Sequence, residues 1–369
     1  MRFKLKLPEN RKIIIFDDEG YNPEEINKII NLEECFLLKV RKKNIKEIYI
    51  NPKILFYTLF YILVKKQKIS VAYFSSIILM IRPKLVLTRN DNLISFSLTA
   101  KNLEKKFKFL AIQKAARYEY GEPFYDKKNL KKIYIPEFAC FGEVEKNIAE
   151  KYNLKIKKFF VCGSLKLAHL IEENKIRNEK EKSFDICLIS ESSTGWNKLY
   201  PGFEEAIGKI AHYTSKFAIE NNKKLVIAGK RKTSHFNQIE KQFYKKYLIG
   251  DFEIQLNNGW NSYELSSKSR LTIGAVSTLL RETLSLKNKI LSCNFFNHDA
   301  WNFPINGICN FQDANYSEFK KRLEEILSLN FEEYEKKLSK NISYLMNTDL
   351  NYLTTKKLKN RISEIVNKY

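Results

Sequence analysis

The sequence predicts an α/β protein built from two Rossmann-like domains with parallel sheets, facing one another across a cleft. The chain has 369 residues, which is long for one domain and comfortable for two. Short apolar runs alternate with helical patterns, as expected when helices cover both faces of parallel sheets. Hydrophobic residues make up 44% of the chain, enough for two cores, which excludes a disordered protein.

Seven apolar, β-branched runs are the predicted strands, and each is followed at once by a polar or glycine-containing cluster. They cover residues 13–16, 85–88, 109–113, 159–163, 186–190, 225–229 and 271–274. Ligands bind outside the carboxyl ends of parallel strands, where these clusters would lie. Strand ends need turn residues in any case, so a structural reading stays open beside the functional one.

Helical patterns lie between most of these runs, for example from Gly202 to Asn221 and from Ser277 to Leu286. The segment from Tyr316 onward has apolar residues at helical spacing, and a final helix is expected near Thr354 to Lys368. We divide the chain into an N-terminal domain, residues 1–155, a C-terminal domain, 156–345, and a C-terminal helix, 346–369, that packs back toward the first domain.

The most apolar region runs from Ile54 to Ile81. Lys65, Lys66 and Lys68 divide it into stretches of about a dozen residues, short of the ~20 that span a bilayer. We expect buried helix and strand here.

The charge balance favours anionic partners. The chain has 65 Lys and Arg against 42 Asp and Glu, a formal net charge of +23. Such a surface attracts nucleic acid, acidic lipid headgroups or phosphorylated substrates, and it is compatible with peripheral contact with an anionic membrane. Biased coding toward Lys, Ile and Asn explains the same excess, so both readings stay open.

The cysteines and the N-terminus indicate a cytoplasmic protein. Six cysteines are scattered without a CxxC pair, as expected of reduced thiols buried in strands. The N-terminal residues MRFKLKLPENRK lack the apolar core of a signal peptide.

The predicted C-terminal domain carries the stronger anion-binding signals. Ser277 and Thr278 fall where a helix begins after a strand, and a helix N-terminus binds phosphate. Glu282, one turn on, is placed to accept ribose hydroxyls, although a plainly capped helix explains the same string. The full predicted nucleotide-sugar set is Gly163, Ser164, Ser192, Ser193, Thr194, Gly195, Lys230, Arg231, Ser277, Thr278 and Glu282.

The predicted N-terminal domain offers candidate catalytic acids. Asp17, Asp18 and Glu19 follow an apolar strand, and three adjacent carboxylates repel one another, which suits a general base near neutral pH. An acidic turn ahead of a helix at Pro23 is the structural alternative. The residues expected to hold an acceptor on the same side are Asn90, Asp91, Asn92, Gln113 and Arg117.

Several enzyme classes lack their signatures. There is no GxGxxG and no GxxxxGK[ST], which argues against a dinucleotide oxidoreductase and a P-loop enzyme. The four histidines are isolated, and no metal-binding motif is present. We expect no metal and no cofactor, with phosphate charge neutralised by helix ends and by Lys and Arg.

The order of four strings carries a family resemblance. They are DDEG, then PKLVLTRNDN with FLAIQKAAR, then IPEFACFGEVEKNIAEKYNLKIKKFFVCGS, then YELSSKSRLTIGAVSTLLRETLSLKNK. Over residues 10 to 310 the chain resembles bacterial surface-carbohydrate biosynthesis proteins, which are glycosyltransferases of the two-domain GT-B type. DDEG is also similar to the acidic motif of bacterial sialyltransferases, and Ser277-Thr278 to their phosphate motif.

The resemblance implies a metal-independent glycosyltransferase of capsule or lipopolysaccharide synthesis. Asp18 or Glu19 would be the base in the first domain, and the second would bind the nucleotide-sugar. The sialyltransferases have a His-Pro pair that this chain lacks, which leaves the donor open between CMP-linked acidic sugars, such as sialic acid or Kdo, and UDP- or GDP-linked ones. The acceptor would be a surface glycan or a lipid-linked precursor.

Two other functions stay open from the sequence. The same phosphate-binding strand ends could serve a polyol-phosphate transferase with a CDP-linked donor. A non-catalytic nucleic-acid-binding protein would use the basic surface, but no module signature and no basic stripe joined to exposed aromatics is present, so no nucleic-acid partner is expected.

Overall fold

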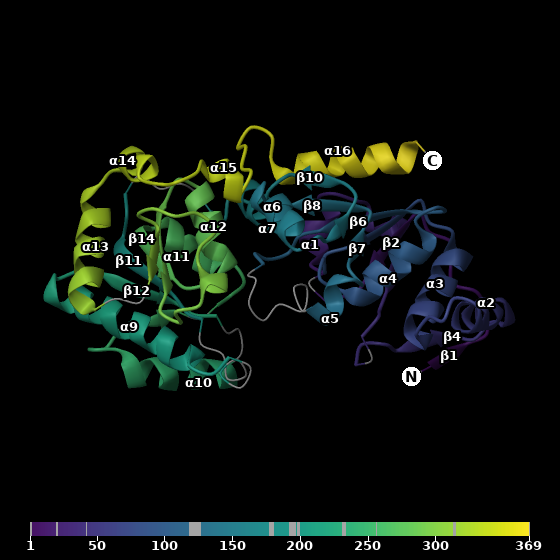
Figure 1. The fold of residues 1–369 in the computed structure, drawn as a ribbon, viewed down its shortest axis with the longest axis horizontal. Coiled ribbons are helices and arrows are strands. Elements are labelled where there is room, and N and C mark those ends of the chain that lie inside the picture. Colours follow the sequence, from purple (N-terminus) through teal and green to yellow (C-terminus); the bar gives the residue numbers. More distant parts are fainter. Residues whose placement is uncertain are drawn as a thin grey trace. The chain divides into compact units, whose positions relative to one another are not determined.

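The computed structural model describes the chain except residues 1, 20, 42, 118–126, 177–180, 192–196, 198–199, 231–233, 256, 313–314 and 369. It consists of two compact units (Figure 1). Unit 1 comprises Met1–Lys114, Pro123–His169 and Asp349–Tyr369. Unit 2 comprises Ala115–Glu122 and Leu170–Thr348.

Unit 1 is built on a six-stranded parallel sheet of order β10-β8-β6-β5-β2-β3. Its strands are β2 (Ile13–Phe16), β3 (Cys35–Leu38), β5 (Leu85–Thr88), β6 (Lys108–Ile112), β8 (Glu137–Cys140) and β10 (Phe159–Val161). Two parallel strand pairs accompany the sheet: β1 (Arg2–Lys4) with β4 (Glu47–Tyr49), and β7 (Tyr134–Ile135) with β9 (Lys155–Ile156).

Helices cover both faces of this sheet, which explains the continuous apolar strands. In β2, Ile14 and Phe16 pack into one core cluster, while Ile13 and Ile15 pack into the other. Helix α16 belongs to the second cluster, through Leu358 and two further apolar residues. The helices of unit 1 are α1 (Pro23–Asn27), α2 (Pro52–Leu63), α3 (Ile69–Ile81), α4 (Ile94–Leu103), α5 (Lys127–Leu130), α6 (Val144–Lys151), α7 (Leu165–Glu172) and α16 (Thr354–Asn367), with a 3-10 turn at Leu32–Glu34.

The apolar region from Ile54 to Ile81 differs from the sequence-based expectation of buried helix and strand. It forms two helices, α2 and α3, and no strand. Helix α3 is largely buried, whereas α2 buries only Ile54, Thr58 and Tyr61. Composition alone suggested burial because nearly every α2 residue is apolar, yet the rest of the fold covers one face of this helix. None of the helices in the described part of the chain combines the length and apolar character needed to cross a bilayer.

Unit 2 contains a second six-stranded parallel sheet, of order β13-β12-β11-β14-β15-β16. Its strands are β11 (Phe184–Ile189), β12 (Leu225–Ala228), β13 (Ile254–Gln255), β14 (Ser269–Gly274), β15 (Lys289–Asn294) and β16 (Asn310–Gln312). Its helices are α9 (Phe203–Glu220), α10 (Ser234–Tyr247), α11 (Asn261–Ser267), α12 (Thr278–Ser285), α13 (Tyr316–Ser328), α14 (Phe331–Lys336) and α15 (Ile342–Leu345), with a 3-10 turn at Asp299–Trp301.

Asparagine is the N-cap residue of many of these helices. Asn22, Asn51, Asn315 and Asn341 each accept a backbone N–H of the following helix, and Asn330 completes a capping box with its third helical residue. The abundant asparagines of this sequence therefore set helix boundaries.

The two sheets share a topological feature that positions the candidate sites. In unit 1 the chain runs from β2 to β3 on one side and later returns to β5 on the other side of β2. In unit 2 it runs from β11 to β12 and later returns to β14. Such switch points leave a crevice outside the carboxyl ends of the strands, where α/β proteins bind ligands.

The seven strands predicted from apolar runs and the two-sheet α/β class are confirmed. The change from unit 1 to unit 2 lies between His169 and Leu170, later than the predicted boundary at 155 and 156. The reason is that β10 pairs with β8 and so completes the first sheet. Gly163 and Ser164 consequently belong to unit 1, not to the predicted C-terminal domain in which we expected them to bind a nucleotide-sugar.

Candidate functional site

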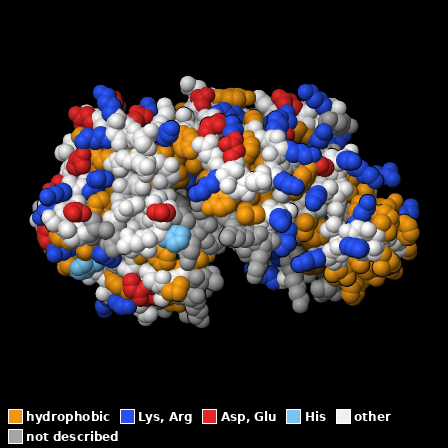
Figure 2. Space-filling model, in the orientation of Figure 1, with side chains coloured by type: hydrophobic (Ala, Val, Ile, Leu, Met, Phe, Trp, Pro, Cys, Tyr) orange, Lys and Arg blue, Asp and Glu red, His pale blue; other side chains and the backbone are white. Residues whose placement is uncertain are grey.

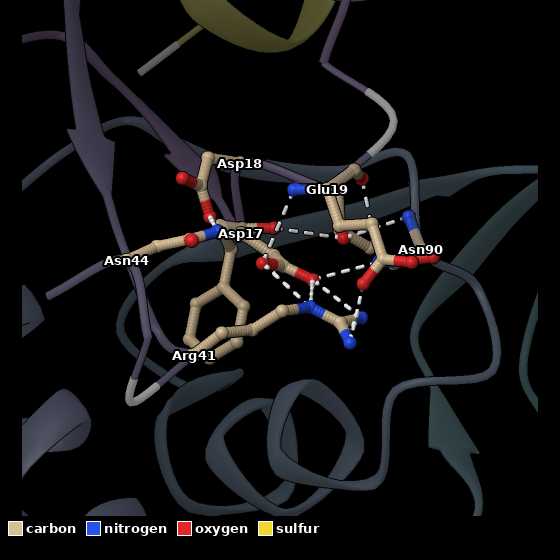
Figure 3. Close-up of polar contacts among 8 residues, drawn as sticks. Asp17, Asp18, Glu19, Arg41, Asn44 and Asn90 are labelled. Carbon is tan, nitrogen blue, oxygen red and sulfur yellow. Dashed lines mark hydrogen bonds and ion pairs between the residues drawn. The ribbon is translucent and has the colours of Figure 1, made fainter. Parts of the chain in front are cut away.

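Asp17 occupies the switch point of unit 1, directly after β2. Its side chain is buried, with the residue only 2% exposed, and its backbone has a φ of 81°, a left-handed conformation that Asp tolerates better than most residues. Its N–H donates to the carbonyl of Leu38 at the end of β3, 3.0 Å away. The carboxylate is thereby turned toward the ends of the neighbouring strands (Figure 3).

Two residues from neighbouring strand ends hold this carboxylate. Arg41 Nε donates a hydrogen bond to Asp17 Oδ2 at 3.1 Å. Nη2 of the same guanidinium also lies 3.1 Å from this oxygen. The Asn90 amide donates to the same oxygen at 2.6 Å. Thr88 fixes Asn90, because its hydroxyl accepts the Asn90 N–H at 3.0 Å while donating to the carbonyl of Phe16 at 2.9 Å.

The three adjacent acids have different surroundings. The Arg41 guanidinium also forms an ion pair with the exposed Glu19, so it lies between Glu19 and Asp17 (Figure 3). Asp18 is half-buried and accepts a hydrogen bond from the Asn44 amide at 3.1 Å. The mutual repulsion expected from the sequence is therefore offset by Arg41, and Asp18 is the acid that stands apart from the ion pairs.

The acidic turn is not the cap of the following helix. Asn22 caps α1, through a hydrogen bond from the Glu24 N–H to its side chain. Of the structural alternative, an acidic turn or N-cap ahead of Pro23, the N-cap is therefore wrong, whereas the acids do form a turn, in which the Tyr21 N–H donates to the Asp18 carbonyl.

The predicted acceptor residues are spread over different surroundings. Asn90 belongs to the Asp17 cluster, and Asn92 is half-buried in the same loop. Asp91 is fully buried, and the Gln113 amide donates to Glu145 at 3.0 Å, so both lie within the fold of unit 1. Arg117 is grouped with unit 2.

In unit 2, Glu191 follows β11 at the corresponding switch point. Its buried carboxylate accepts the N–H groups of Ala275 and, at 2.9 Å, of Val276, both in the loop between β14 and α12. Burial raises the pKa of Glu191 above its ordinary value, and these hydrogen bonds together with the charge of Lys230 offset part of that rise. An internal carboxylate therefore shapes the loop in which the sequence predicts a phosphate site.

The hydroxyls at the start of α12 are arranged around the same loop. Ser277 is the N-cap, and its Oγ accepts the Leu279 N–H at 3.3 Å. Thr278 Oγ1 accepts the Ala116 N–H at 2.8 Å. Each hydroxyl accepts in these bonds, and its own O–H can donate to a phosphate oxygen.

Lys230 follows β12 at the same edge of the sheet. Its side chain is exposed, and its N–H donates to the buried Glu240 at 2.9 Å, a carboxylate that also binds Ser190. The preceding Gly229 is required by space, because a Cβ there would lie 2.5 Å from the carbonyl oxygen of Gln255. Lys230 and the start of α12 do not follow neighbouring strands, because β11 lies between β12 and β14.

The other predicted nucleotide-binding residues have these positions. Glu282 is buried and accepts the Tyr263 hydroxyl at 2.7 Å. Gly163, with a φ of 93°, and Ser164, whose Oγ accepts the Leu167 N–H, form the turn into α7. Ser192, Ser193, Thr194, Gly195 and Arg231 lie outside the described residues. Within the described ranges, no group of three or more His, Cys, Asp or Glu side chains is placed to hold a metal ion.

Sequence reasoning missed Arg41, Asn44 and Glu191. A signal for the first two existed, since CFLL followed by KVRKKN repeats the pattern of an apolar run and a polar cluster. Glu191 is the first charged residue after an apolar strand, as Asp17 is in unit 1.

Glu191→Gln should change how stability depends on pH. The folded pKa of Glu191 is raised above 4.5, so the native state holds this proton more tightly than the unfolded chain. The protonated Glu191 therefore adds to the free energy of unfolding below pH 4.5, and this contribution is lost as pH rises through the folded pKa. Urea unfolding across pH should show this loss in the wild type and not in Glu191→Gln. The exposed Glu332→Gln is the control, and equal slopes in all three proteins would contradict the expectation.

Solved structures are similar to the chain over its whole length. The UDP-GlcNAc 2-epimerase of Methanocaldococcus jannaschii, solved with UDP-GlcNAc and UDP, has a TM-score of 0.55 at 14% identity, with all of both chains covered. The Neisseria meningitidis UDP-GlcNAc 2-epimerase, bound to UDP-GlcNAc, has 0.55 at 15%, again with full coverage. S. aureus MnaA, solved with UDP, has 0.57 at 12%, with 98% of both chains covered.

At these identities the likeness establishes the fold, which is the two-domain Rossmann-like α/β fold of the GT-B type. No protein-family model matches the sequence, and no curated protein matches it significantly.

Proposed function

We propose that this chain is a nucleotide-sugar enzyme, and specifically a metal-independent glycosyltransferase. The observation that carries the proposal is the full-length likeness to proteins solved with UDP or UDP-GlcNAc, together with polar strand ends at the switch point of unit 2. The nucleotide would lie against unit 2. Asp18 of unit 1 would act on the acceptor.

The nucleotide phosphates would be bound at the start of α12. The Ser277 and Thr278 hydroxyls can donate to phosphate oxygens, and the helix N-terminus and Lys230 supply positive potential. Glu191 would hold the loop in shape. UDP is the first nucleotide to test because the similar structures contain it, and CMP-linked acidic sugars remain the prediction of the sialyltransferase resemblance.

The proposed reaction transfers a sugar to a hydroxyl. The acceptor oxygen forms a bond to the anomeric carbon, the bond between that carbon and the nucleotide phosphate breaks, and its electron pair leaves with the nucleotide. Asp18 would take the acceptor proton. Charge growing on the leaving phosphate would be stabilised by the α12 N-terminus and Lys230.

Ser277→Ala combined with Thr278→Ala should weaken nucleotide binding by about 100-fold or more, since each of the two hydrogen bonds to a charged group contributes roughly 1.5–3 kcal/mol. Calorimetry with CMP-, UDP- and GDP-sugars measures this and identifies the donor. Ser328→Ala, an exposed serine at the end of α13, is the control. Unchanged affinity in the double variant would mean that the phosphate site lies elsewhere.

A second candidate function is epimerisation of a UDP-sugar. It is favoured by the 2-epimerases of Methanocaldococcus jannaschii and Neisseria meningitidis, to which the chain is similar in structure. Incubation with UDP-GlcNAc and no acceptor separates the two, because an epimerase forms an isomeric UDP-sugar whereas a transferase needs an acceptor. A phosphate in the transferred group would instead indicate a polyol-phosphate transferase.

We propose a surface glycan or its lipid-linked precursor in capsule or lipopolysaccharide synthesis as the acceptor, with the reaction at the cytoplasmic side of the membrane. The support is the sequence resemblance and the net charge of +23.

A further inference from the structure

The exposed large apolar side chains of the described chain are concentrated in one part of unit 1. Helix α2 and the residues around it contain most of them, and few lie elsewhere. Figure 2 shows this patch as the orange area over α2 and β1, with Lys and Arg side chains around it. Its members are Phe3, Leu5, Leu7, Leu55, Phe56, Tyr57, Leu59, Phe60, Leu63, Val64 and Ile69.

Helix α2 is apolar on both sides. Its inner face, which includes Ile54 and Tyr61, packs on α3, and Thr58 there donates a hydrogen bond to Ser76 of α3 at 3.1 Å. Its outer face exposes Phe56 by 66% and Leu63 by 73%. A helix that is apolar all round is normally buried, so this face requires an apolar partner.

The apolar patch continues inward. A cavity of about 660 Å³ adjoins it, lined by α2, α3, β3 and β4. Leu55 and Ile69 belong to the exposed patch and also line this cavity, with Tyr73 and Ile77 deeper inside. The apolar surface therefore extends from the exposed patch into this cavity.

Positive charge borders the patch on two sides. Lys65, Lys66 and Lys68 follow α2 and are exposed, and Lys6 lies between the exposed leucines near β1. No Asp or Glu occurs between Ile48 and Asn90, so neither α2 nor α3 carries a carboxylate. The border of this surface is therefore cationic after α2, whereas on the β1–β4 side Lys4 pairs with Glu47 and Lys6 adds a further positive charge.

We propose that this surface docks on an anionic phospholipid bilayer, with the outer face of α2 inserted among the acyl chains and the lysines against the headgroups. An apolar helix face flanked by lysines is the arrangement of interfacial membrane helices. A second copy of the chain fits less well, since a symmetric contact would bring the lysine borders of both copies together. The docking does not depend on the reaction proposed above.

The test is cosedimentation of the full chain with vesicles of phosphatidylcholine, alone or mixed with phosphatidylglycerol. We expect binding to the mixed vesicles that weakens with added salt. Phe56→Ser with Leu59→Ser should reduce it roughly 100-fold, because two large apolar side chains leave the lipid. Both side chains are exposed, and circular dichroism checks that the variant is folded.

Lys65→Gln, Lys66→Gln and Lys68→Gln together should reduce binding to mixed vesicles by roughly 100-fold at low salt. The matched controls are Ile219→Ser, an exposed apolar residue of unit 2, and Lys356→Gln with Lys359→Gln on α16, all of which should bind as the wild type does.

Three outcomes would overturn the proposal. One is undiminished vesicle binding by the folded apolar variant. Another is equal binding to neutral and anionic vesicles at low salt. The third is absence of vesicle binding combined with a dimer, seen by analytical ultracentrifugation, that Phe56→Ser dissociates, since the patch would then be an interface between copies.

Discussion

Asp18→Asn should slow turnover by about 10² to 10⁴ while nucleotide affinity stays unchanged, as is typical for loss of a general base. The structure distinguishes Asp18 from its neighbours. Asp17 is buried against Arg41 and Asn90, and Glu19 shares the same guanidinium. Asp18 accepts a hydrogen bond from the neutral Asn44 amide and, among the described residues, forms none of the ion pairs that involve Asp17 and Glu19.

The matched comparison is Glu19→Gln, which we expect to reduce turnover less than about tenfold, because Arg41 already compensates that charge. Single-turnover rates with saturating donor, together with calorimetry, separate chemistry from binding. If both variants keep full activity, the acids of unit 1 take no part in the mechanism. Retention of configuration at the anomeric carbon would mean that Asp18 does not act as a simple base.

The sequence located the strand ends well because each buried parallel strand is a continuous apolar run. The predicted strands at 13–16 and 271–274 fall on β2 and β14, and Ser277 caps α12 as expected. These features are local. Hydrophobic pattern and capping chemistry act over a few residues, so they are legible in one sequence.

The sequence could not assign roles to the three adjacent acids. Which acid is buried depends on Arg41 and Asn90, which come from other strand ends. Arg41 stands in a basic run that resembles any solvated surface. Glu191 follows an apolar strand as Asp17 does, but its role was missed because its partners are backbone N–H groups, which have no sequence signature.

The local sequence pattern also could not predict whether the outer face of α2 is covered by the rest of the protein. The string PKILFYTLFYIL has the same apolar character whether protein or lipid covers it. Only the folded unit shows that α3 covers one face and that nothing in the described chain covers Phe56. Similarly, the domain boundary depended on the pairing of β10 with β8, a contact between distant segments.

Asp17→Ala should destabilise unit 1 by about 3 kcal/mol, at the lower end for breaking a buried ion pair. The lower end applies because the Arg41 side chain is 33% exposed and can still reach water and Glu19. Asn90 would lose the acceptor of its 2.6 Å hydrogen bond. Glu19→Ala, which removes the exposed partner of the same arginine, should cost no more than about 1 kcal/mol.

Asp17→Gly separates backbone strain from the lost contacts. With a φ of 81° at this position, alanine adds roughly 1–2 kcal/mol of strain that glycine avoids. The glycine variant should therefore be more stable than the alanine variant and still clearly less stable than the wild type. Urea unfolding followed by circular dichroism measures all three proteins.

Tryptophan fluorescence assigns the change to a unit, because the sequence ranges of unit 1 contain no tryptophan, whereas Trp260 and Trp301 belong to unit 2. We expect the Asp17 variants to shift the circular dichroism transition more than the fluorescence transition. A loss below about 1 kcal/mol in Asp17→Ala would show that the ion pair with Arg41 adds little to folding. Burying the Asp17 carboxylate would then cost about as much free energy as its ion pair returns. We would in that case ascribe to Asp17 a role beside Asp18 in the reaction and not a role in stability.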